Sequence, residues 1–197
     1  MVRDAQGNLY GTTWSGGAWN LGTVYKLEPS GKETVLHSFT GGADGGNPAA
    51  GVALDSAGNL YGTTVFGGAA SQTGIPGGCS FQGGSVRPGN RALHGFTGLS
   101  DGGESQSGVI LDRRGNLYGT TYYGGAGDQG VVYEIEPSGQ ETVLYNFTNA
   151  NGGGGNPIAG VIPAGSRVPE SQAHKPEILV LLQAQSLSYV TRSRSRG

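Results

Sequence analysis

Gly7-Asn8-Leu9-Tyr10-Gly11-Thr12-Thr13 decides the fold of this chain, because the same seven residues recur at Gly58–Thr64 and Gly115–Thr121. Three identical heptapeptides indicate an array of one repeated structural unit. They begin 51 and 57 residues apart (58 − 7 and 115 − 58). A period of about 50 residues is typical of a four-stranded propeller blade or a kelch-type repeat.

Each unit contains four short extended segments separated by turn signals. The second copy of the first segment is Gly51–Asp55, and the heptapeptide supplies the second segment, Leu60–Thr64. Copy three shows the remaining two as Val131–Glu136 and Glu141–Phe147. Gly-Asn and Pro-Ser-Gly sequences between the segments favour tight turns. Four strands joined in this way predict an antiparallel meander in each unit.

The sequence therefore predicts an all-β fold, a propeller-like array of about three four-stranded antiparallel blades. We expect a repeat domain over residues 1–162, with units at about 2–50, 51–107 and 108–158 and the start of a fourth at 159–162. Copy one is expected to supply three strands, and the repeat stops matching at Pro163, where Leu54 and Leu111 stood. Three blades are fewer than closed propellers use, so we predict an incomplete propeller.

Two segments depart from the repeat. Copy two has a six-residue insertion and reads Phe81–Pro88 where the other copies have a regular strand and turn, which we interpret as a shifted reading frame. Residues 163–197 share nothing with the units. We expect this tail to be mostly disordered, with a short helix around Glu177–Tyr189.

The composition and charge of the chain argue against nucleic-acid and membrane partners. The chain has 197 residues, 40 of them glycine, and a net charge of −2. Residues up to 162 carry 7 basic and 12 acidic side chains, a balance of −5, and no basic stripe. This argues against a nucleic-acid partner. The longest apolar run of the tail, Ile178–Leu182, is far too short to span a membrane.

The unit resembles the Gloeobacter/Verrucomicrobium tandem repeat (GloVer repeat) over roughly residues 2–162. The resemblance rests on Asp-x-x-Gly-Asn-Leu-Tyr-Gly-Thr-Thr, Val-Tyr-x-Leu-x-Pro-Ser-Gly, Glu-Thr-Val-Leu-x-x-Phe-Thr and Asp-Gly-Gly-Asn-Pro, recurring in register. It implies a long bacterial array, secreted or attached to the cell surface, and no particular chemistry. The Asp-x-x-Gly-Asn-Leu-Tyr segment is also similar to a turn in NHL-type and gluconolactonase-like propellers.

Candidate binding residues lie in the two longer connections of each unit, which a meander places at one edge. They are aromatic residues after each Thr-Thr pair and acidic residues in Gly-rich loops, namely Trp14, Asp44, Phe66, Asp101, Tyr122, Tyr123 and Asp128. The aromatics are suited to stacking on sugar rings, although packing between neighbouring blades is the favoured alternative. Asp44 and Asp101 are suited to Ca²⁺, although one carboxylate per blade falls short of six to eight oxygens and favours a turn-forming role. Asp128 lies in the loop 124–130 and has no acidic partner in the other copies.

We identify no catalytic, metal or cofactor residues. No two carboxylates converge in the pattern that glycoside hydrolysis needs. His37 and His94 occupy one repeat position and are expected to pack or face solvent, and the single Cys79 has no partner.

The sequence therefore predicts a non-enzymatic binding module of a bacterial secreted or surface protein, with a protein or glycan ligand and self-association through open blade edges. The chain begins in mid-unit without a signal peptide, so we expect a fragment. Two alternatives stay open: a piece of a carbohydrate-active or lactonase-like propeller enzyme, and a degraded reading frame with no selected function.

Overall fold

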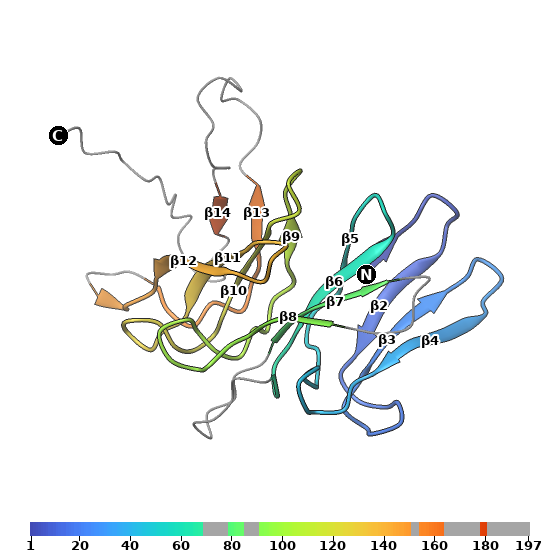
Figure 1. Cartoon of the computed structure of the whole chain (residues 1–197), viewed down its shortest axis with the longest axis horizontal. Coiled ribbons are helices and arrows are strands. Elements are labelled where there is room, and N and C mark those ends of the chain that lie inside the picture. The colour runs from blue at the N-terminus through green and yellow to red at the C-terminus, as the bar shows by residue number, and fades with distance from the viewer. Residues whose placement is uncertain (69–78, 85–90, 151–153, 164–177, 181–197) are drawn as a thin grey trace.

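The computed structural model describes residues 1–68, 79–84, 91–150, 154–163 and 178–180, and within these ranges all regular structure is strand. Three four-stranded antiparallel sheets follow one another along the long axis of the molecule (Figure 1). Sheet 1 contains β1 (Val2–Arg3), β2 (Leu9–Thr13), β3 (Thr23–Leu27) and β4 (Glu33–Ser38). Sheet 2 contains β5 (Ala53–Leu54), β6 (Asn59–Thr64), β7 (Cys79–Gly84) and β8 (Arg91–Gly95). Sheet 3 contains β9 (Ile110–Leu111), β10 (Leu117–Thr120), β11 (Val131–Ile135) and β12 (Glu141–Asn146).

Each sheet is a simple meander, with its four strands hydrogen-bonded in chain order. The prediction of an all-β chain with four-stranded antiparallel units is confirmed. The three units also share an irregularity: the pairing of the third and fourth strands shifts at the same repeat position, after Val24, Ser80 and Val132. The unusual sequence of copy two still forms its third strand, β7, in the expected place.

Two predictions are wrong. Copy one was expected to supply three strands, but Val2–Arg3 pair with Leu9 and Tyr10 and complete sheet 1. The helix expected around Glu177–Tyr189 is replaced at Ile178–Val180 by β14, which pairs antiparallel with β13 (Val161–Pro163). A run of Ile, Leu and Val suits an extended strand. The edge of β13 supplies backbone partners for this strand, whereas a helix would have to form its backbone hydrogen bonds within itself. The rest of the predicted helix lies outside the described residues.

The turn ahead of the second strand is built by one aspartate. Asp4 Oδ1 accepts hydrogen bonds from the backbone N–H groups of Gln6 (3.0 Å) and Asn8 (2.8 Å), while its Oδ2 accepts from the Tyr10 hydroxyl (2.9 Å). Asp55 and Asp112 repeat this arrangement in the next two sheets. An Asx turn of this kind holds the hairpin closed without help from distant residues. The recurring heptapeptide therefore encodes a local structure.

Glycine in the second strand makes room for a tyrosine of the third. A Cβ atom at Gly119 would lie 2.4 Å from the Tyr133 hydroxyl, and one at Gly11 would lie 2.7 Å from the Tyr25 hydroxyl. Both distances are far below van der Waals contact. In sheets 1 and 3, the Gly of Leu-Tyr-Gly-Thr-Thr is thus fixed by a cross-strand contact; in sheet 2 the strand partner of Gly62 is Phe81.

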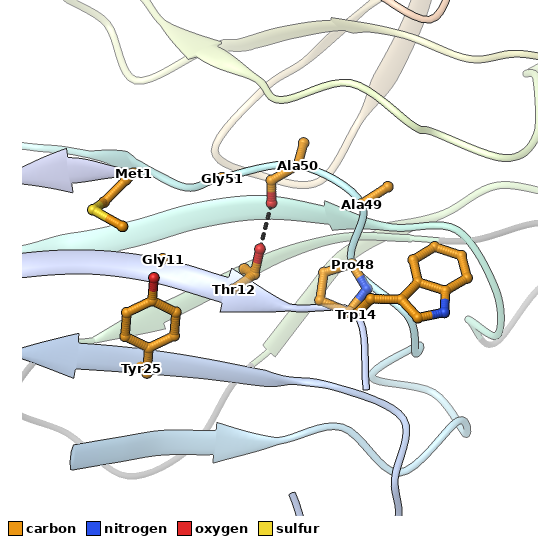
Figure 2. A pocket seen from close by; sticks show the side chains of 9 residues that line it. All are labelled: Met1, Gly11, Thr12, Trp14, Tyr25, Pro48, Ala49, Ala50 and Gly51. Atoms are coloured by element: carbon orange, nitrogen blue, oxygen red, sulfur yellow. Dashed lines mark hydrogen bonds between the residues drawn. The ribbon is translucent and has the colours of Figure 1, made fainter. Parts of the chain in front are cut away.

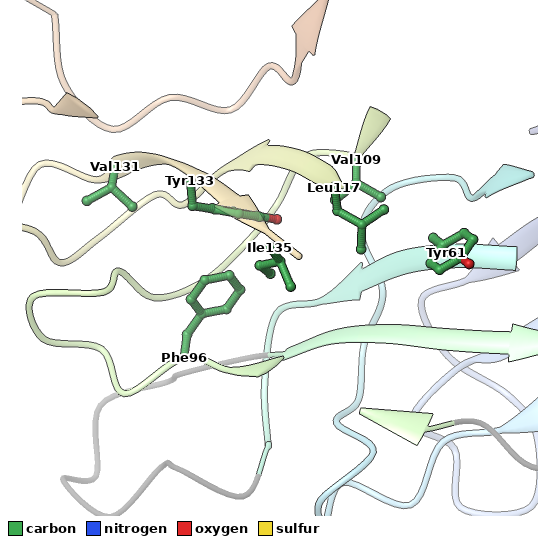
Figure 3. Close-up of a cluster of buried hydrophobic side chains, with 7 residues drawn as sticks. All are labelled: Tyr61, Phe96, Val109, Leu117, Val131, Tyr133 and Ile135. Carbon is green, nitrogen blue, oxygen red and sulfur yellow. The ribbon is translucent and has the colours of Figure 1, made fainter. Parts of the chain in front are cut away.

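The hydrophobic core lies between consecutive sheets. Tyr10, Val24 and Phe39 of the first unit pack against Val52 and Leu60 of the second. The cluster between sheets 2 and 3 is larger (Figure 3), and its fully buried Phe96 packs against Tyr133 in a tilted arrangement with 4.9 Å between ring centroids. Truncating such a buried phenylalanine to alanine typically costs about 3–5 kcal/mol of the unfolding free energy. Each sheet is therefore stabilised mainly by its neighbours.

Threonine hydroxyls tie each sheet to the segment that leads into the next. Thr12 Oγ1 donates to the Ala50 carbonyl (2.6 Å), Thr63 Oγ1 to the Ser107 carbonyl (2.8 Å) and Thr120 Oγ1 to the Ala159 carbonyl (3.0 Å). The spacing of these acceptors repeats with the units. One hydrogen bond of the same kind therefore fixes the offset between every pair of successive units.

Candidate functional site

The two longer connections of each unit meet at one edge of the array. Gly46, which follows the fourth strand of sheet 1, forms a β-bridge with Phe66, which follows the second strand of sheet 2. Gly103 and Tyr123 form the equivalent bridge between sheets 2 and 3. This edge therefore carries a continuous surface of interlocked loops, called here the loop edge.

Asparagine or glutamate fixes the bend in each fourth-to-first connection. Asn47, Glu104 and Asn156 occupy the same repeat position and have φ values of 55°, 51° and 51°. Asn47 Nδ2 donates to the Trp14 carbonyl (3.0 Å), and Asn156 Nδ2 donates to the Tyr122 carbonyl (2.9 Å). The left-handed conformation is tolerated best by Gly and Asn, and here the side-chain bonds stabilise it further. The loop edge is thus held by specific contacts.

Large aromatic side chains are exposed on the loop edge. Trp14 is 50% exposed, Trp19 64%, Phe66 38% and Tyr123 38%. Trp14 and Phe66 come from different units and meet edge to face, with ring centroids 6.1 Å apart. Tyr122 lies edge to face against Tyr123 at 4.6 Å. These four exposed residues are called the aromatic rim.

The structure separates residues that the sequence had grouped together. Trp14 directly follows Thr-Thr, and its equivalents in the next sheets are Val65, which is buried, and Tyr122, which is partly buried. Phe66 and Tyr123 stand one position later, both 38% exposed. Successive residues of an extended segment point in opposite directions, which separates Phe66 and Tyr123 from the inward position of Val65 and Tyr122. Trp14 occupies that inward position in sheet 1 and is nevertheless 50% exposed.

Asp44 and Asp101 are engaged in closing their own loops. Asp44 accepts hydrogen bonds from the Thr40 backbone N–H (3.1 Å) and hydroxyl, and its Oδ2 lies 2.9 Å from His37 Nε2. These bonds hold the pKa of Asp44 below its ordinary value even though burial acts in the opposite direction. Asp101 makes the same contacts with Thr97. The two carboxylates therefore act as acceptors within the loop.

Asp128 also has a loop-closing contact. Its Oδ1 accepts from the Gly124 backbone N–H (3.0 Å), and its φ is 51°. Asn20 occupies the equivalent position in the first unit, with φ 57° and a matching bond from the Gly16 N–H (3.0 Å). An uncharged asparagine makes the same bond in sheet 1, so this contact does not depend on the negative charge.

A group of titratable side chains bridges sheets 2 and 3. Glu141 lies on β12, and the pKa of its carboxyl is raised to about 7, first by burial and then by the charge of Asp101, while His94 acts in the opposite direction. His94 Nε2 is 3.5 Å from Asp101 Oδ2, too long for a good hydrogen bond. In the described part of the chain, Glu141 Oε1 and His94 Nε2 are buried without a hydrogen-bond partner.

An open pocket of about 470 Å³ lies beside sheet 1 (Figure 2). Gly11, Thr12 and Tyr25 contribute the strand side of this pocket, and residues 48–51 contribute the other side. Trp14 stands at its margin, with the indole directed past Ala49. The lining is uncharged and mixed in polarity.

Sequence reasoning missed two features of this region. One is Trp19, the most exposed residue of the aromatic rim, which lies in the Gly-rich loop of copy one. The other copies have no tryptophan at this position, and that difference was the signal in the sequence that could have identified it. The histidines were expected only to pack or face solvent, whereas His37 contacts Asp44 and packs on Phe39 (4.8 Å between ring centroids). The spacing His-x2-Thr-x3-Asp, shared by copies one and two, was the signal for this contact.

Two kinds of structural feature are absent from the described ranges. Within these ranges no group of three or more His, Cys, Asp or Glu residues is placed to hold a metal ion. The same ranges contain no helix with the length and apolar character needed to cross a membrane. The loop edge presents exposed aromatic rings and backbone polar groups.

Comparison with known proteins agrees with the repeat pattern. The model of the Gloeobacter/Verrucomicrobia repeat matches residues 1–168, so the chain belongs to this repeat family. Searches of curated proteins and of solved structures found no match to the chain.

Proposed function

We propose that this chain, as a member of the Gloeobacter/Verrucomicrobia repeat family, is a non-enzymatic binding module of a bacterial secreted or surface protein, and that it binds glycans at its loop edge. The sheets are the blades of an incomplete propeller in this proposal. Support for the blade arrangement comes from the serial order of the sheets and from the cores between them. Support for the location is the family resemblance alone.

The observation that carries the proposal is the contact between Trp14 and Phe66. Two rings from neighbouring units lie 6.1 Å apart and stay 50% and 38% exposed. Exposed aromatic surface that gathers in one place is a mark of interaction sites. An indole face beside a second ring offers a platform on which the C–H face of a sugar can stack, and the surrounding loop backbone supplies hydrogen-bonding groups. Trp19, in the same loop, extends this platform.

A glycan array with soluble polysaccharides tests the proposal. We expect wild-type protein to bind a subset of glycans without releasing products, and Trp14→Ala to weaken binding at least about tenfold, the loss of one good stacking contact. Tyr145→Ala is the control, because Tyr145 is an exposed aromatic residue (38%, against 50% for Trp14) that lies on β12. Its binding should equal that of the wild type.

Three outcomes would contradict the proposal. If the protein binds no glycan, glycans are excluded as its ligands. If it instead binds a protein and loses that binding in Trp14→Ala, the loop edge is a protein-binding site. Equal weakening by Tyr145→Ala would show that the rim has no special role. Hydrolysis of a bound polysaccharide would favour the enzyme alternative.

A further inference from the structure

The loop edge repeats one structural position at two successive junctions between units. Gly46 and Phe66 exchange two backbone hydrogen bonds (2.9 and 3.2 Å) where sheet 1 meets sheet 2. Gly103 and Tyr123 exchange the same two bonds (2.9 and 3.1 Å) where sheet 2 meets sheet 3. Each junction lies between two sheets of this chain, and the two aromatic rings therefore have equivalent surroundings.

The two rings are also presented alike. Phe66 and Tyr123 are both 38% exposed. Each is braced edge to face by a second ring, with 6.1 Å between the centroids of Trp14 and Phe66 and 4.6 Å between those of Tyr122 and Tyr123. The loop edge therefore carries two stacking surfaces of one kind. They are called here the first subsite (Phe66 with Trp14) and the second subsite (Tyr123 with Tyr122).

Close packing of the backbone holds each ring in place. Glycine follows both rings, at Gly67 and Gly124. A Cβ atom there would lie 2.8 Å from the Gly41 carbonyl oxygen and 2.5 Å from the Leu99 carbonyl oxygen, so each loop presses against the loop of the unit before it. Little conformational freedom is left to lose on binding, which favours affinity. The spacing between the two subsites is thus set by the fold.

A ligand that occupies both subsites must be a chain. Packed sheets lie about 10 Å apart, a spacing that a single sugar ring does not cover. Two equivalent subsites suit a polymer that presents the same face at regular intervals. β-1,4-Linked glucose and xylose chains do this, because their equatorial linkages keep the chain extended and leave C–H groups on the faces of each ring.

The charge of the loop edge selects among such chains. The longer connections are residues 14–22, 39–52, 65–78, 96–109, 121–130 and 147–160, and their sequences contain neither lysine nor arginine. Their charged residues are all acidic, namely Asp44, Asp101, Glu104 and Asp128. Like charges repel within a Debye length, about 10 Å at 0.1 M ionic strength. Uronate and sulfate groups are therefore disfavoured at this edge, and a neutral chain is not.

We propose that the loop edge binds a single neutral, β-1,4-linked polysaccharide chain, which stacks on the first and second subsites together. This inference rests on the glycan-binding function proposed above, and it names the ligand class and the mode of binding. Once one subsite holds the chain, the other meets it at a raised effective concentration. Affinity therefore rises in a step at the chain length that first reaches both subsites.

Titration calorimetry of the full chain with cello- and xylo-oligosaccharides of two to six sugars measures this step. The Kd of the wild type should fall at least about tenfold between the shortest and the longest oligosaccharide of a series that binds. Tyr123→Ala removes the second subsite, and its Kd should change only a few-fold, by the larger number of equivalent positions on a longer chain. Tyr123→Phe keeps the ring and should show the wild-type step.

Tyr145→Ala is the matched control for Tyr123→Ala. Tyr145 is also a tyrosine with 38% exposure, and Phe147 braces it edge to face with 5.0 Å between ring centroids, but it lies on β12. This variant should keep the wild-type step. All variants should keep the wild-type circular dichroism spectrum.

Two cellulose derivatives with one backbone test the charge of the ligand. Hydroxyethyl cellulose is neutral and carboxymethyl cellulose is anionic. In affinity gel electrophoresis at low salt, the neutral polymer should retard the wild type and the anionic polymer should not. Equal or stronger retardation by carboxymethyl cellulose would exclude the neutral ligand class.

The remaining outcomes separate this inference from the proposed function. A Kd that is independent of chain length, or a Tyr123→Ala protein with the full step, would show that the glycan occupies one subsite, and glycan binding itself would stand. Binding to other glycans but to neither oligosaccharide series would overturn the ligand class named here. Absence of binding to every glycan would overturn this inference and the proposed function together.

Discussion

Replacing Glu141 by glutamine should stabilise the protein at pH 8 and leave its stability unchanged at pH 4. Glu141 joins sheet 3 to sheet 2, where His94 and Asp101 are the titratable groups that face it. Its Oε1 is buried without a hydrogen-bond partner within the described residues. Burial therefore destabilises the ionised carboxylate of Glu141 in the folded protein. A neutral amide of the same shape does not carry this cost.

The magnitude follows from the pKa of this carboxyl. A rise from 4.5 to about 7 corresponds to about 3 kcal/mol at about 1.4 kcal/mol for each pH unit. The side chain is only partly buried, so water screens part of this effect, and we take about half, about 1.5 kcal/mol.

The sign follows from the direction of the shift. A pKa that is higher in the folded state than in the unfolded state means that the folded state holds the proton more tightly. The favourable contribution of protonated Glu141 is complete below pH 4.5 and is lost as the pH rises through about 7. The unfolding free energy of Glu141→Gln minus that of the wild type should therefore rise from about zero at pH 4 to about 1.5 kcal/mol at pH 8.

Urea unfolding at a series of pH values, followed by circular dichroism, measures this difference. Glu33→Gln is the matched control, since Glu33 has the same repeat position in sheet 1 but is exposed to water. Its difference from the wild type should be the same at every pH. A constant difference for Glu141→Gln, or a variant less stable than the wild type at pH 8, would refute the reasoning.

Two further predictions test contacts of the repeat. Thr63→Val should lower the unfolding free energy by about 1–2 kcal/mol, because the buried Ser107 carbonyl loses its 2.8 Å hydrogen bond. Urea unfolding measures this loss, and a loss near zero would show that the bond contributes nothing to stability. Gly119→Ala should cost at least about 1 kcal/mol more than Gly11→Ala, since the Tyr133 ring is fully buried and has no room to move. Equal melting temperatures for the two alanine variants would contradict this.

The candidate site could be predicted from the sequence only in part. Asp44 and Asp101 close their Gly-rich loops through bonds to Thr40 and Thr97, four positions earlier, as the turn-forming interpretation expects. Val65 is buried and Phe66 is exposed because successive residues of the extended segment point to opposite sides. Which of the two sides is covered depends on the neighbouring unit, and no local pattern records that. The environment of Glu141 was equally hidden, since His94 and Asp101 belong to another sheet.

The sequence by itself determined the repeat, the four-stranded pattern of the unit and the turn before the second strand, although it missed the first strand of copy one. These features are local: one aspartate, the residues just after it and a tyrosine six positions on make the turn. Tertiary structure alone decided which identical residues are core. Tyr133 is fully buried and Tyr25 is partly exposed, although both follow the same motif, because burial depends on whether another sheet lies against the face.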